Sequence, residues 1–351
     1  MTSSANSDRD DVDDVAGIDP LPVTAWMAEQ VELNPPLQFE IIAGGHSNLT
    51  YRVSDAAGRR WVLRRPPLAH LLAGAHDMVR EHRILAALER TPVPTPPVVG
   101  LCTDAEVNDA DFYVTEFVDG TVLRSLADAE LLTPEARGVL SRQLVEVQAT
   151  IHDTDLGATG LDTLGRPEDY VARQIHVWRR QFNAMTSRDL PIIERVHDML
   201  VASIPPQTEA TLVHGDYRLD NCLSRHDGEL AAVLDWEIST LGDPLADFGF
   251  SLGYWVEPGD GFNPLGHDAT AAEGFWTREQ LANEYARLTG RDVSAMQWFF
   301  AFASWRLACI LEGVHARYVG GAIPDIPPEV HEFPDSIVAL AERAESVLAN
   351  L

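Results

Sequence analysis

Lysine is absent from this chain of 351 residues, so all 26 basic side chains are arginines. A Walker A phosphate-binding loop and a Schiff-base active site both need a lysine, and the composition therefore excludes both. Cysteine is scarce as well. Cys102, Cys222 and Cys309 include no CxxC pair, which argues against a disulfide framework or a zinc ribbon and fits a reducing cytoplasm.

Positive charge is outnumbered, because 54 acidic residues leave a formal net charge of −28. This acidic excess disfavours binding to nucleic acid or to an anionic membrane surface. Long apolar runs are lacking too, since no stretch approaches the ~20 residues of a membrane span. The N-terminus does not show the basic and then apolar order of a signal peptide. We therefore expect a cytoplasmic protein without nucleic-acid or membrane partners.

The first third of the chain predicts a small antiparallel sheet behind an acidic leader. Residues 1–19 contain six aspartates and few apolar side chains, so we expect them to be disordered. A short helix is expected at 24–32, and helical spacing over 75–88 predicts one helix packed on the sheet. Runs of β-branched and aromatic residues predict the strands at 39–43, 49–53, 61–65 and 112–118.

The remainder of the chain is predicted to be mainly helical. Two short strands, within 212–223 and 229–237, bracket a loop. We therefore expect an α+β fold, with an N-terminal sheet lobe at 20–118 and a C-terminal helical lobe at 119–351. Helices are expected at 133–152, 168–186, 191–203, 244–254, 277–289, 294–317 and 335–350.

The loop between those strands carries the motif HGDYRLDN at 214–221. Asp216 and Asn221 lie five residues apart, so a carboxylate can face a substrate hydroxyl while an amide oxygen faces a metal ion. Asp235 ends the second apolar strand and can supply another oxygen of the kind that Mg²⁺ prefers. Phosphoryl transfer needs such a base beside metal-neutralised phosphates. Each aspartate alone would more often cap a helix or bind its own backbone, so the joint pattern carries the prediction.

HGDYRLDN, followed by VLDWE and by GDPLADFGF at 242–250, resembles the catalytic signature of the aminoglycoside phosphotransferase and choline kinase family, distant relatives of protein kinases. RRPP at 64–67, AHDMVREHRIL at 75–85, PVPTP at 92–96 and FYVTEFVDG at 112–120 are similar to the kinase-like domains linked to acyl-CoA dehydrogenases. The resemblance implies a two-lobed protein-kinase-like fold that binds ATP and Mg²⁺ and phosphorylates a small-molecule hydroxyl.

Matched position by position, the resemblance implies that Asp216 is the catalytic base and that Asn221 and Asp235 are the Mg²⁺ ligands. It further implies that the backbone of the linker Glu116, Phe117 and Val118 binds adenine. Structural roles near the site, such as helix capping and loop anchoring, are expected for His214, Glu237, Asp243 and Asp247.

The loop AGGHSNLTY at 43–51 lies where a kinase places a hairpin over the phosphates, and Gly44, Gly45, Ser47 and Asn48 can approach them. A tight turn without a ligand is the alternative.

Family members carry a lysine on the third strand that grips the phosphates and pairs with a glutamate on the next helix. The equivalent here is Arg64, with Glu81 as its expected partner. Either Arg64 takes the place of the lysine or nucleotide binding is weakened.

Acceptor residues are sought on two predicted helices. Arg173, Arg179 and Arg180 can receive a phosphate or carboxylate, unless they form a solvated face. Trp305 belongs to an aromatic stripe that can line a ligand site or the core. The dehydrogenase-linked relatives imply a hydroxylated acyl group or its CoA ester as acceptor, whereas the family name suggests an aminoglycoside. We favour a metabolite.

Two other functions stay open. The missing lysine permits a nucleotide-binding module without turnover, although a pure binder needs no base. Metal-dependent phosphate hydrolysis is suggested by His-Asp dipeptides that share no scaffold, at 76–77, 152–153, 197–198, 226–227 and 267–268.

Overall fold

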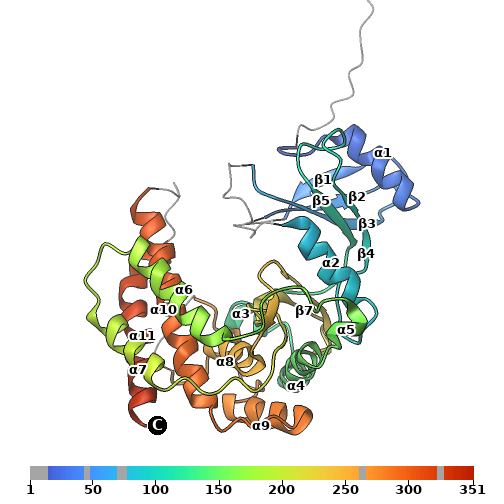
Figure 1. Cartoon of the computed structure of the whole chain (residues 1–351). Coiled ribbons are helices and arrows are strands. Elements are labelled where there is room, and N and C mark those ends of the chain that lie inside the picture. Colours follow the sequence, from blue (N-terminus) through green and yellow to red (C-terminus); the bar gives the residue numbers. More distant parts are fainter. Residues whose placement is uncertain (1–14, 43–47, 69–76, 261–265, 322–327) are drawn as a thin grey trace, which may run out of the picture. The chain divides into compact units, whose positions relative to one another are not determined.

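The computed structural model describes residues 15–42, 48–68, 77–260, 266–321 and 328–351 (Figure 1). The chain forms two compact units. The first comprises Met1–Ala86 and Pro96–Phe117, and the second comprises Ala87–Thr95 and Val118–Leu351. The boundary after Phe117 lies one residue before the predicted one, and the return of 87–95 to the second unit was not predicted.

The first unit is built on a five-stranded antiparallel sheet in the order β1-β2-β3-β5-β4 (Figure 1). Four strands match the predicted runs. The unpredicted strand, β4, follows the proline-rich segment and contains Gly100 at a register shift, where a side chain would press against Trp26. The strands are β1 (Gln38–Ile41), β2 (Leu49–Ser54), β3 (Arg60–Arg65), β4 (Val98–Cys102) and β5 (Phe112–Glu116).

Helix α1 (Pro20–Gln30) covers one face of this sheet, in addition to the single packed helix that was predicted. Val23 and Met27 of α1 are fully buried in one apolar cluster with Leu63 of β3. Trp26 meets Phe112 edge to face, with 5.0 Å between ring centroids. Alternation along β3 places Leu63 on the α1 face and the neighbouring Arg64 on the opposite face.

The expected disorder of residues 1–19 is wrong for 15–19, and residues 1–14 lie outside the described part of the chain. Ile18 is 7% exposed and belongs to the same apolar cluster as Val23 and Met27 of α1. The Tyr51 hydroxyl donates to the Ala16 carbonyl at 2.6 Å. Arg65, itself buried, donates to the Gly17 carbonyl and forms an ion pair with Asp109 at 2.7 Å. The composition argument failed because distant strands, rather than local neighbours, supply the apolar partners.

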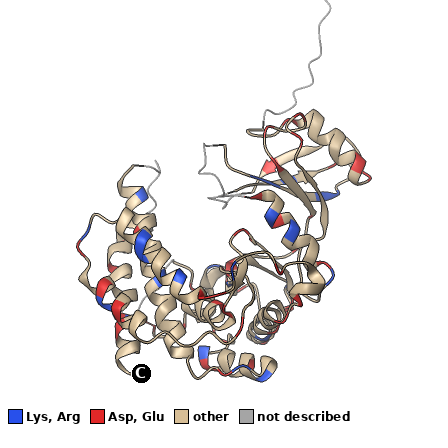
Figure 2. Cartoon of the chain, in the orientation of Figure 1, with Lys and Arg blue, Asp and Glu red and all other residues tan. Residues whose placement is uncertain are grey.

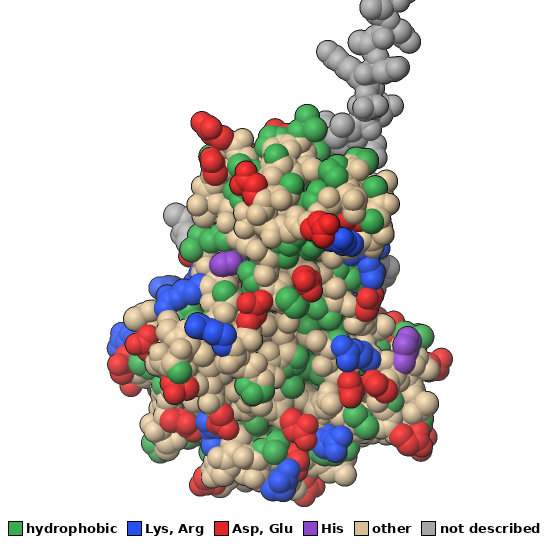
Figure 3. Space-filling view, turned by 90° about the vertical axis from the view of Figure 1, so that its right-hand side faces the viewer, with side chains coloured by type: hydrophobic (Ala, Val, Ile, Leu, Met, Phe, Trp, Pro, Cys, Tyr) green, Lys and Arg blue, Asp and Glu red, His purple; other side chains and the backbone are tan. Residues whose placement is uncertain are grey.

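Helix α2 (Met78–Leu88) bears the glutamate that reaches β3 from the other face. Basic residues stand out on α2 and on α6 (Tyr170–Met185) of the second unit (Figure 2). On the face drawn in Figure 3, acidic and basic side chains are interspersed with apolar and neutral ones. No helix in the described part of the chain is long and apolar enough to cross a membrane.

The second unit is mainly helical, and its long helix α10 packs against α6, α7, α8 and α11. Local signals set several helix ends: Thr133 caps α4 by accepting from the Ala136 N–H at 3.2 Å, and a capping box of Thr277 and Gln280 begins α9. The helices are α3 (Leu126–Ala129), α4 (Pro134–His152), α5 (Leu156–Thr159), α6 (Tyr170–Met185), α7 (Pro191–Ala202), α8 (Pro244–Tyr254), α9 (Arg278–Thr289), α10 (Met296–Val319) and α11 (Phe333–Ala349).

Two short antiparallel strand pairs lie among these helices. One joins β6 (Thr211–Val213) to β9 (Thr240–Gly242), and the other joins β7 (Cys222–Ser224) to β8 (Leu230–Val233). Strand β9 was not predicted, because three residues show too little alternation to be recognised.

Truncating Ile18 to alanine tests whether the segment before α1 belongs to the core. Loss of a buried isoleucine side chain should lower the free energy of unfolding by about 2–3 kcal/mol, measured by urea denaturation. The matched control is Leu21→Ala, because Leu21 is 74% exposed and its truncation should change that free energy by less than about 0.5 kcal/mol. Equal effects of the two substitutions would contradict the packing described above.

Candidate active site

Asp216 lies on the loop that connects β6 to β7, at the centre of a small hydrogen-bonded cluster. Its Oδ2 accepts from Asn221 Nδ2 at 2.9 Å and from Arg218 Nε at 3.2 Å. Asn221 Nδ2 also donates to the Asp216 carbonyl at 2.8 Å, which closes the loop on itself. Burial raises the pKa of Asp216, and the positive charge of Arg218 opposes that rise only in part. A carboxyl with a raised pKa is a better proton acceptor than an exposed one.

Asn221 and Asp235 are brought together by the pairing of β7 with β8. Cys222 faces Val233 in the ladder, and the Leu234 N–H donates to the Asn221 carbonyl at 2.8 Å. Asp235 is the next residue, and its φ of 63° is a left-handed conformation that residues other than glycine seldom adopt. Strained backbone of this kind is concentrated at functional sites.

The donor set of Asn221 and Asp235 suits Mg²⁺. Because Asn221 Nδ2 donates twice to Asp216, the other end of the side-chain amide, Oδ1, faces away from Asp216. Mg²⁺ is usually held by one or two protein oxygens, substrate phosphates and water rather than by a complete protein cage. Consistently, the described residues contain no group of three or more His, Cys, Asp or Glu side chains placed to hold a metal, the described His-Asp dipeptides included.

His214 is fully buried, and both of its ring nitrogens are engaged. Nδ1 accepts from the Asp216 N–H at 3.3 Å, so Nε2 carries the proton and donates to the Leu234 carbonyl at 2.9 Å. The ring thereby ties the backbone of the loop that bears Asp216 to the end of β8. This arrangement has the form of a structural histidine and leaves no nitrogen for a metal.

Asp247, in α8, anchors the same loop through hydrogen bonds to its backbone. Its carboxylate accepts from the Gly215 N–H at 2.7 Å and from the His214 N–H at 3.2 Å. Side chains of Gln148 and His152 complete its surroundings at 3.2 Å and 3.1 Å. Burial raises the pKa of Asp247, but the hydrogen bond and charge of His152 outweigh it and the pKa is lowered overall.

Two other residues were expected to act structurally near the site. Asp243 caps α8 by accepting from the Leu245 N–H at 2.8 Å and the Ala246 N–H at 3.3 Å. Glu237 is half-buried in the turn between β8 and β9.

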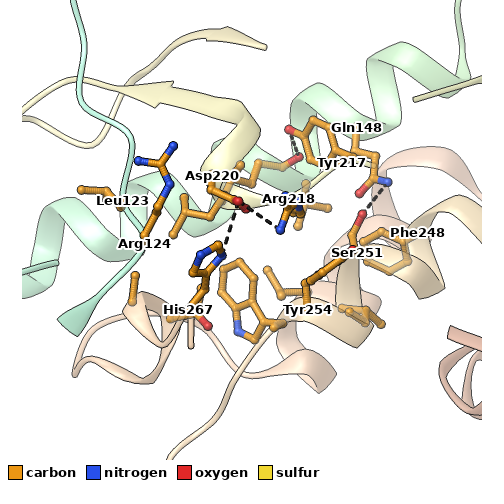
Figure 4. A pocket seen from close by; sticks show the side chains of 18 residues that line it. Leu123, Arg124, Gln148, Tyr217, Arg218, Asp220, Phe248, Ser251, Tyr254 and His267 are labelled. Atoms are coloured by element: carbon orange, nitrogen blue, oxygen red, sulfur yellow. Dashed lines mark hydrogen bonds and ion pairs between the residues drawn. The ribbon is translucent and has the colours of Figure 1, made fainter. Parts of the chain in front are cut away.

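Arg218, Asp220 and His267 form a charged network that the sequence did not single out (Figure 4). Arg218 Nη1 lies 3.0 Å from Asp220 Oδ2, and His267 Nδ1 lies 3.4 Å from the same oxygen. Burial raises the pKa of Asp220, but His267 and Arg218 together lower it below its usual value. The signal was available, because Arg218 and Asp220 belong to HGDYRLDN itself. His267 was named only in a His-Asp dipeptide, which gave no indication that Asp220 is its partner.

This network lies at the edge of a mainly apolar cavity in the second unit (Figure 4). Its walls include Leu144, Phe248 and Leu252, and its volume is about 50 Å³. A cavity of that size has room for a few water molecules and not for a substrate. Arg218 lines this cavity and also donates to Asp216.

In the first unit, Arg64 and Glu81 form the predicted ion pair. Arg64 Nε lies 3.3 Å from Glu81 Oε2, with the two side chains 15% and 1% exposed. Their pairing is confirmed. Asn48 is buried at the start of β2. Gly44, Gly45 and Ser47 lie outside the described residues.

The predicted linker occupies the end of the first unit. Glu116 ends β5, and its N–H donates to the Pro97 carbonyl at 2.8 Å. The N–H of Phe117 donates to the Arg60 carbonyl at 3.2 Å. The chain passes from the first unit to the second between Phe117 and Val118, so the linker coincides with this change.

The prediction that Trp305 binds the acceptor is wrong. Its side chain is fully buried, and its indole N–H donates to the Ile193 carbonyl of α7 at 3.1 Å. It forms part of the core because α10 is apolar on nearly every side. Trp305 therefore lines the core, which was the alternative to a ligand site.

The three arginines of α6 do not form one cluster. Arg179 forms an ion pair with Glu194 of α7, and Arg180 is exposed. Arg173 donates to the Arg166 carbonyl at 2.6 Å, and its Nη1 is buried without a hydrogen-bond partner. Of the three, Arg173 alone has a buried donor to spare.

Comparison with known proteins decides the family, because the model of the phosphotransferase enzyme family matches residues 38–297. The chain belongs to this family. It is 37% identical to acyl-CoA dehydrogenase family member 10 of Mus musculus over 81% of the chain and 33% identical to family member 11 of Gallus gallus over 86%. The chain spans only 27% and 39% of the length of these relatives. The resemblance drawn from the motifs is confirmed.

Solved structures agree with this family and with the expected fold. A Ralstonia eutropha protein assigned as an aminoglycoside phosphotransferase is 32% identical, with a TM-score of 0.78 over 94% of this chain and 98% of its own. Choline kinase from Cryptosporidium parvum is 13% identical, with a TM-score of 0.61 over 93% and 95%, and shares the fold. The phosphotransferase therefore has the predicted protein-kinase-like fold, with a small antiparallel sheet and a larger helical part.

Replacing Asp247 with asparagine tests how far the catalytic loop depends on this one carboxylate. The amide presents a donor to groups that already donate, so the free energy of unfolding should fall by about 3 kcal/mol. Asp243→Asn in the same helix is the control, since asparagine caps helices well and should change that free energy by less than about 0.5 kcal/mol. Urea denaturation followed by tryptophan fluorescence measures both. A loss of under 1 kcal/mol in D247N would refute the anchoring role.

Proposed function

We propose that this phosphotransferase moves the γ-phosphoryl group of ATP onto a hydroxyl of a small molecule, with Asp216 as the base. The observation that carries the proposal is the cluster of Asp216, Asn221 and Asp235 at the ends of β6, β7 and β8. The Asp216 carboxylate would accept the hydroxyl proton while the substrate oxygen bonds to phosphorus and the bond from phosphorus to ADP breaks.

Asn221 and Asp235 would hold Mg²⁺, which neutralises negative charge on the phosphates when it is bound. The hydrogen bonds from Asn221 to Asp216 keep the amide oriented for this task. The left-handed backbone at Asp235 supports the same assignment, because strained conformations of this kind are concentrated at functional sites.

Nucleotide phosphates would be gripped by Arg64, held in place by Glu81. Arginine can bind phosphate through two parallel hydrogen bonds, so its planar fork can serve where other members of the family use an ammonium group. The backbone of Glu116 to Val118 and the loop containing Gly44, Gly45, Ser47 and Asn48 would complete the nucleotide site. GDP and ADP complexes among the structural neighbours support a nucleotide as donor.

The acceptor we propose is a hydroxylated acyl group or its CoA ester. This rests on the names of the relatives, acyl-CoA dehydrogenase family members, of which this chain spans the lesser part. A kinase that phosphorylates a hydroxyacyl group and a dehydrogenase that oxidises an acyl group would both recognise an acyl chain. An aminoglycoside acceptor is the alternative that the structural neighbours suggest.

The direct test offers the purified chain ATP, Mg²⁺ and a set of hydroxyacyl-CoA thioesters, and follows ADP release and the phosphorylated product. We expect product from hydroxyacyl-CoA and none from the same acyl-CoA without its hydroxyl. Asp216→Asn should lower kcat by at least about 10³-fold, because it removes the base. ATP binding by D216N, measured by calorimetry, should stay within about threefold of wild type.

Other results of this test separate the remaining candidates. Product from aminoglycosides and none from hydroxyacyl-CoA would assign the chain to antibiotic modification. ATP binding without transfer to any acceptor would favour the nucleotide-binding module without turnover, which the arginine at position 64 makes worth testing. Undiminished transfer by D216N would remove Asp216 from the role of base.

Arg64→Ala should raise the KM for ATP by about 30-fold or more, because a charge-assisted grip on the phosphates is lost together with the ion pair to Glu81. Arg64→Lys should recover most of the affinity by restoring the residue usual in the family. Arg52→Ala is the control, since Arg52 pairs with Glu40 in the exposed part of the same sheet. ATP use that survives R64A unchanged would exclude Arg64 from the nucleotide site.

A further inference from the structure

Arg306, one residue after the misassigned Trp305, is a buried cation beside the catalytic loop. It lies in α10 and is 6% exposed. Its Nη2 donates to the Gly215 carbonyl at 3.2 Å, while its Nε has no hydrogen-bond partner. Among the described residues, no carboxylate lies within ion-pair distance of its guanidinium.

Aromatic rings take the place of that missing anion. The guanidinium carbon of Arg306 lies 3.7 Å from the ring centroid of Phe250 in α8 and 5.3 Å from that of Trp178 in α6. Such contacts offset part of the cost of removing the charge from water. They do not replace a paired carboxylate, and an unpaired buried charge lowers stability by several kcal/mol.

Arg188, which pairs with a residue of α10, shows the usual arrangement of a buried ion pair. Arg188 bonds Glu312 of α10, with 3.1 Å between Nε and Oε2, and the Glu312 side chain is 2% exposed. Arg188 therefore serves the fold as half of an ion pair. Arg306 has no such partner, and its one hydrogen bond goes to the loop that bears Asp216. The contact that accounts for a buried arginine at this position is therefore its hydrogen bond to the loop, and not an ion pair that stabilises the fold.

Gly215 is the residue that Arg306 holds, and it is constrained on both sides. Its φ is 85°, its N–H donates to Asp247 at 2.7 Å, and its carbonyl accepts from Arg306. The carbonyl of Gly215 belongs to the same peptide plane as the N–H of Asp216. Fixing this plane fixes the N and Cα atoms of Asp216, from which its side chain extends.

We propose that Arg306 is a positioning residue for Asp216, retained for the orientation of the catalytic loop at a cost in stability. The proposal rests on the proposed function, because it takes Asp216 as the base. Its consequence is that the two effects of removing Arg306 have opposite signs: activity falls while stability is kept or rises.

The test compares Arg306→Met, Arg306→Lys and Arg188→Met in the full chain. R306M should lower kcat on the order of 100-fold, as expected for a misplaced base, with the KM for ATP within about twofold of wild type. Its Tm should equal or exceed that of wild type, since an apolar side chain replaces an unpaired buried charge. R306K, which keeps one donor for the Gly215 carbonyl, should recover at least a third of the lost activity on a logarithmic scale.

R188M is the matched control, with the reverse pattern. Its Tm should fall, because Glu312 is left buried and unpaired, while kcat below the transition stays within about twofold of wild type. R306M with a lowered Tm and an unchanged kcat would make Arg306 a structural residue and overturn the inference alone. If the wild type transfers no phosphoryl group to any acceptor, the proposed function fails and the inference fails with it.

Discussion

The candidate active site depends on one set of hydrogen bonds, those that the Asp247 carboxylate accepts from the loop bearing Asp216. Two successive backbone N–H groups, those of His214 and Gly215, converge on it, and side chains from α4 fill its other positions. A carboxylate taken out of water needs this many donors, and the loop needs an acceptor for N–H groups that no strand can pair. Each satisfies the other, so the loop that carries Asp216 has one low-energy arrangement.

A second constraint comes from the absence of lysine. Arginine is the only permanently charged basic side chain in the sequence. Three of its settings are a buried glutamate at Arg64, two aspartates at Arg218 and aromatic rings at Arg306. Its planar, weakly hydrated group tolerates all three, whereas a compact ammonium would suit only the first two. The composition thus permits a buried cation at Arg306 that a lysine-based site would not readily keep.

Periodicity and motif spacing predicted much of the fold, because long amphipathic helices and alternating strands are local patterns. They predicted the long helices of the second unit and four of the five strands of the sheet, but not the short helices α3 and α5. The partnership of Arg64 with Glu81 followed from the family resemblance. Periodicity and spacing failed where the decisive partner is distant in the chain: Ile18 finds its cluster on the sheet, β9 exists only through β6, and Trp305 is turned to α7 by the packing of α10. Arg306 was passed over for the same reason, since no local pattern relates α10 to Gly215.

Leu234 contributes to the candidate active site through the polar groups of its backbone. Its N–H donates to the Asn221 carbonyl and its carbonyl accepts from His214, so this single residue joins the segments that bear Asn221 and Asp235. Proline cannot take this place, because proline lacks the N–H that donates to Asn221. The requirement at position 234 is therefore met by the main chain, which every residue type except proline supplies in full.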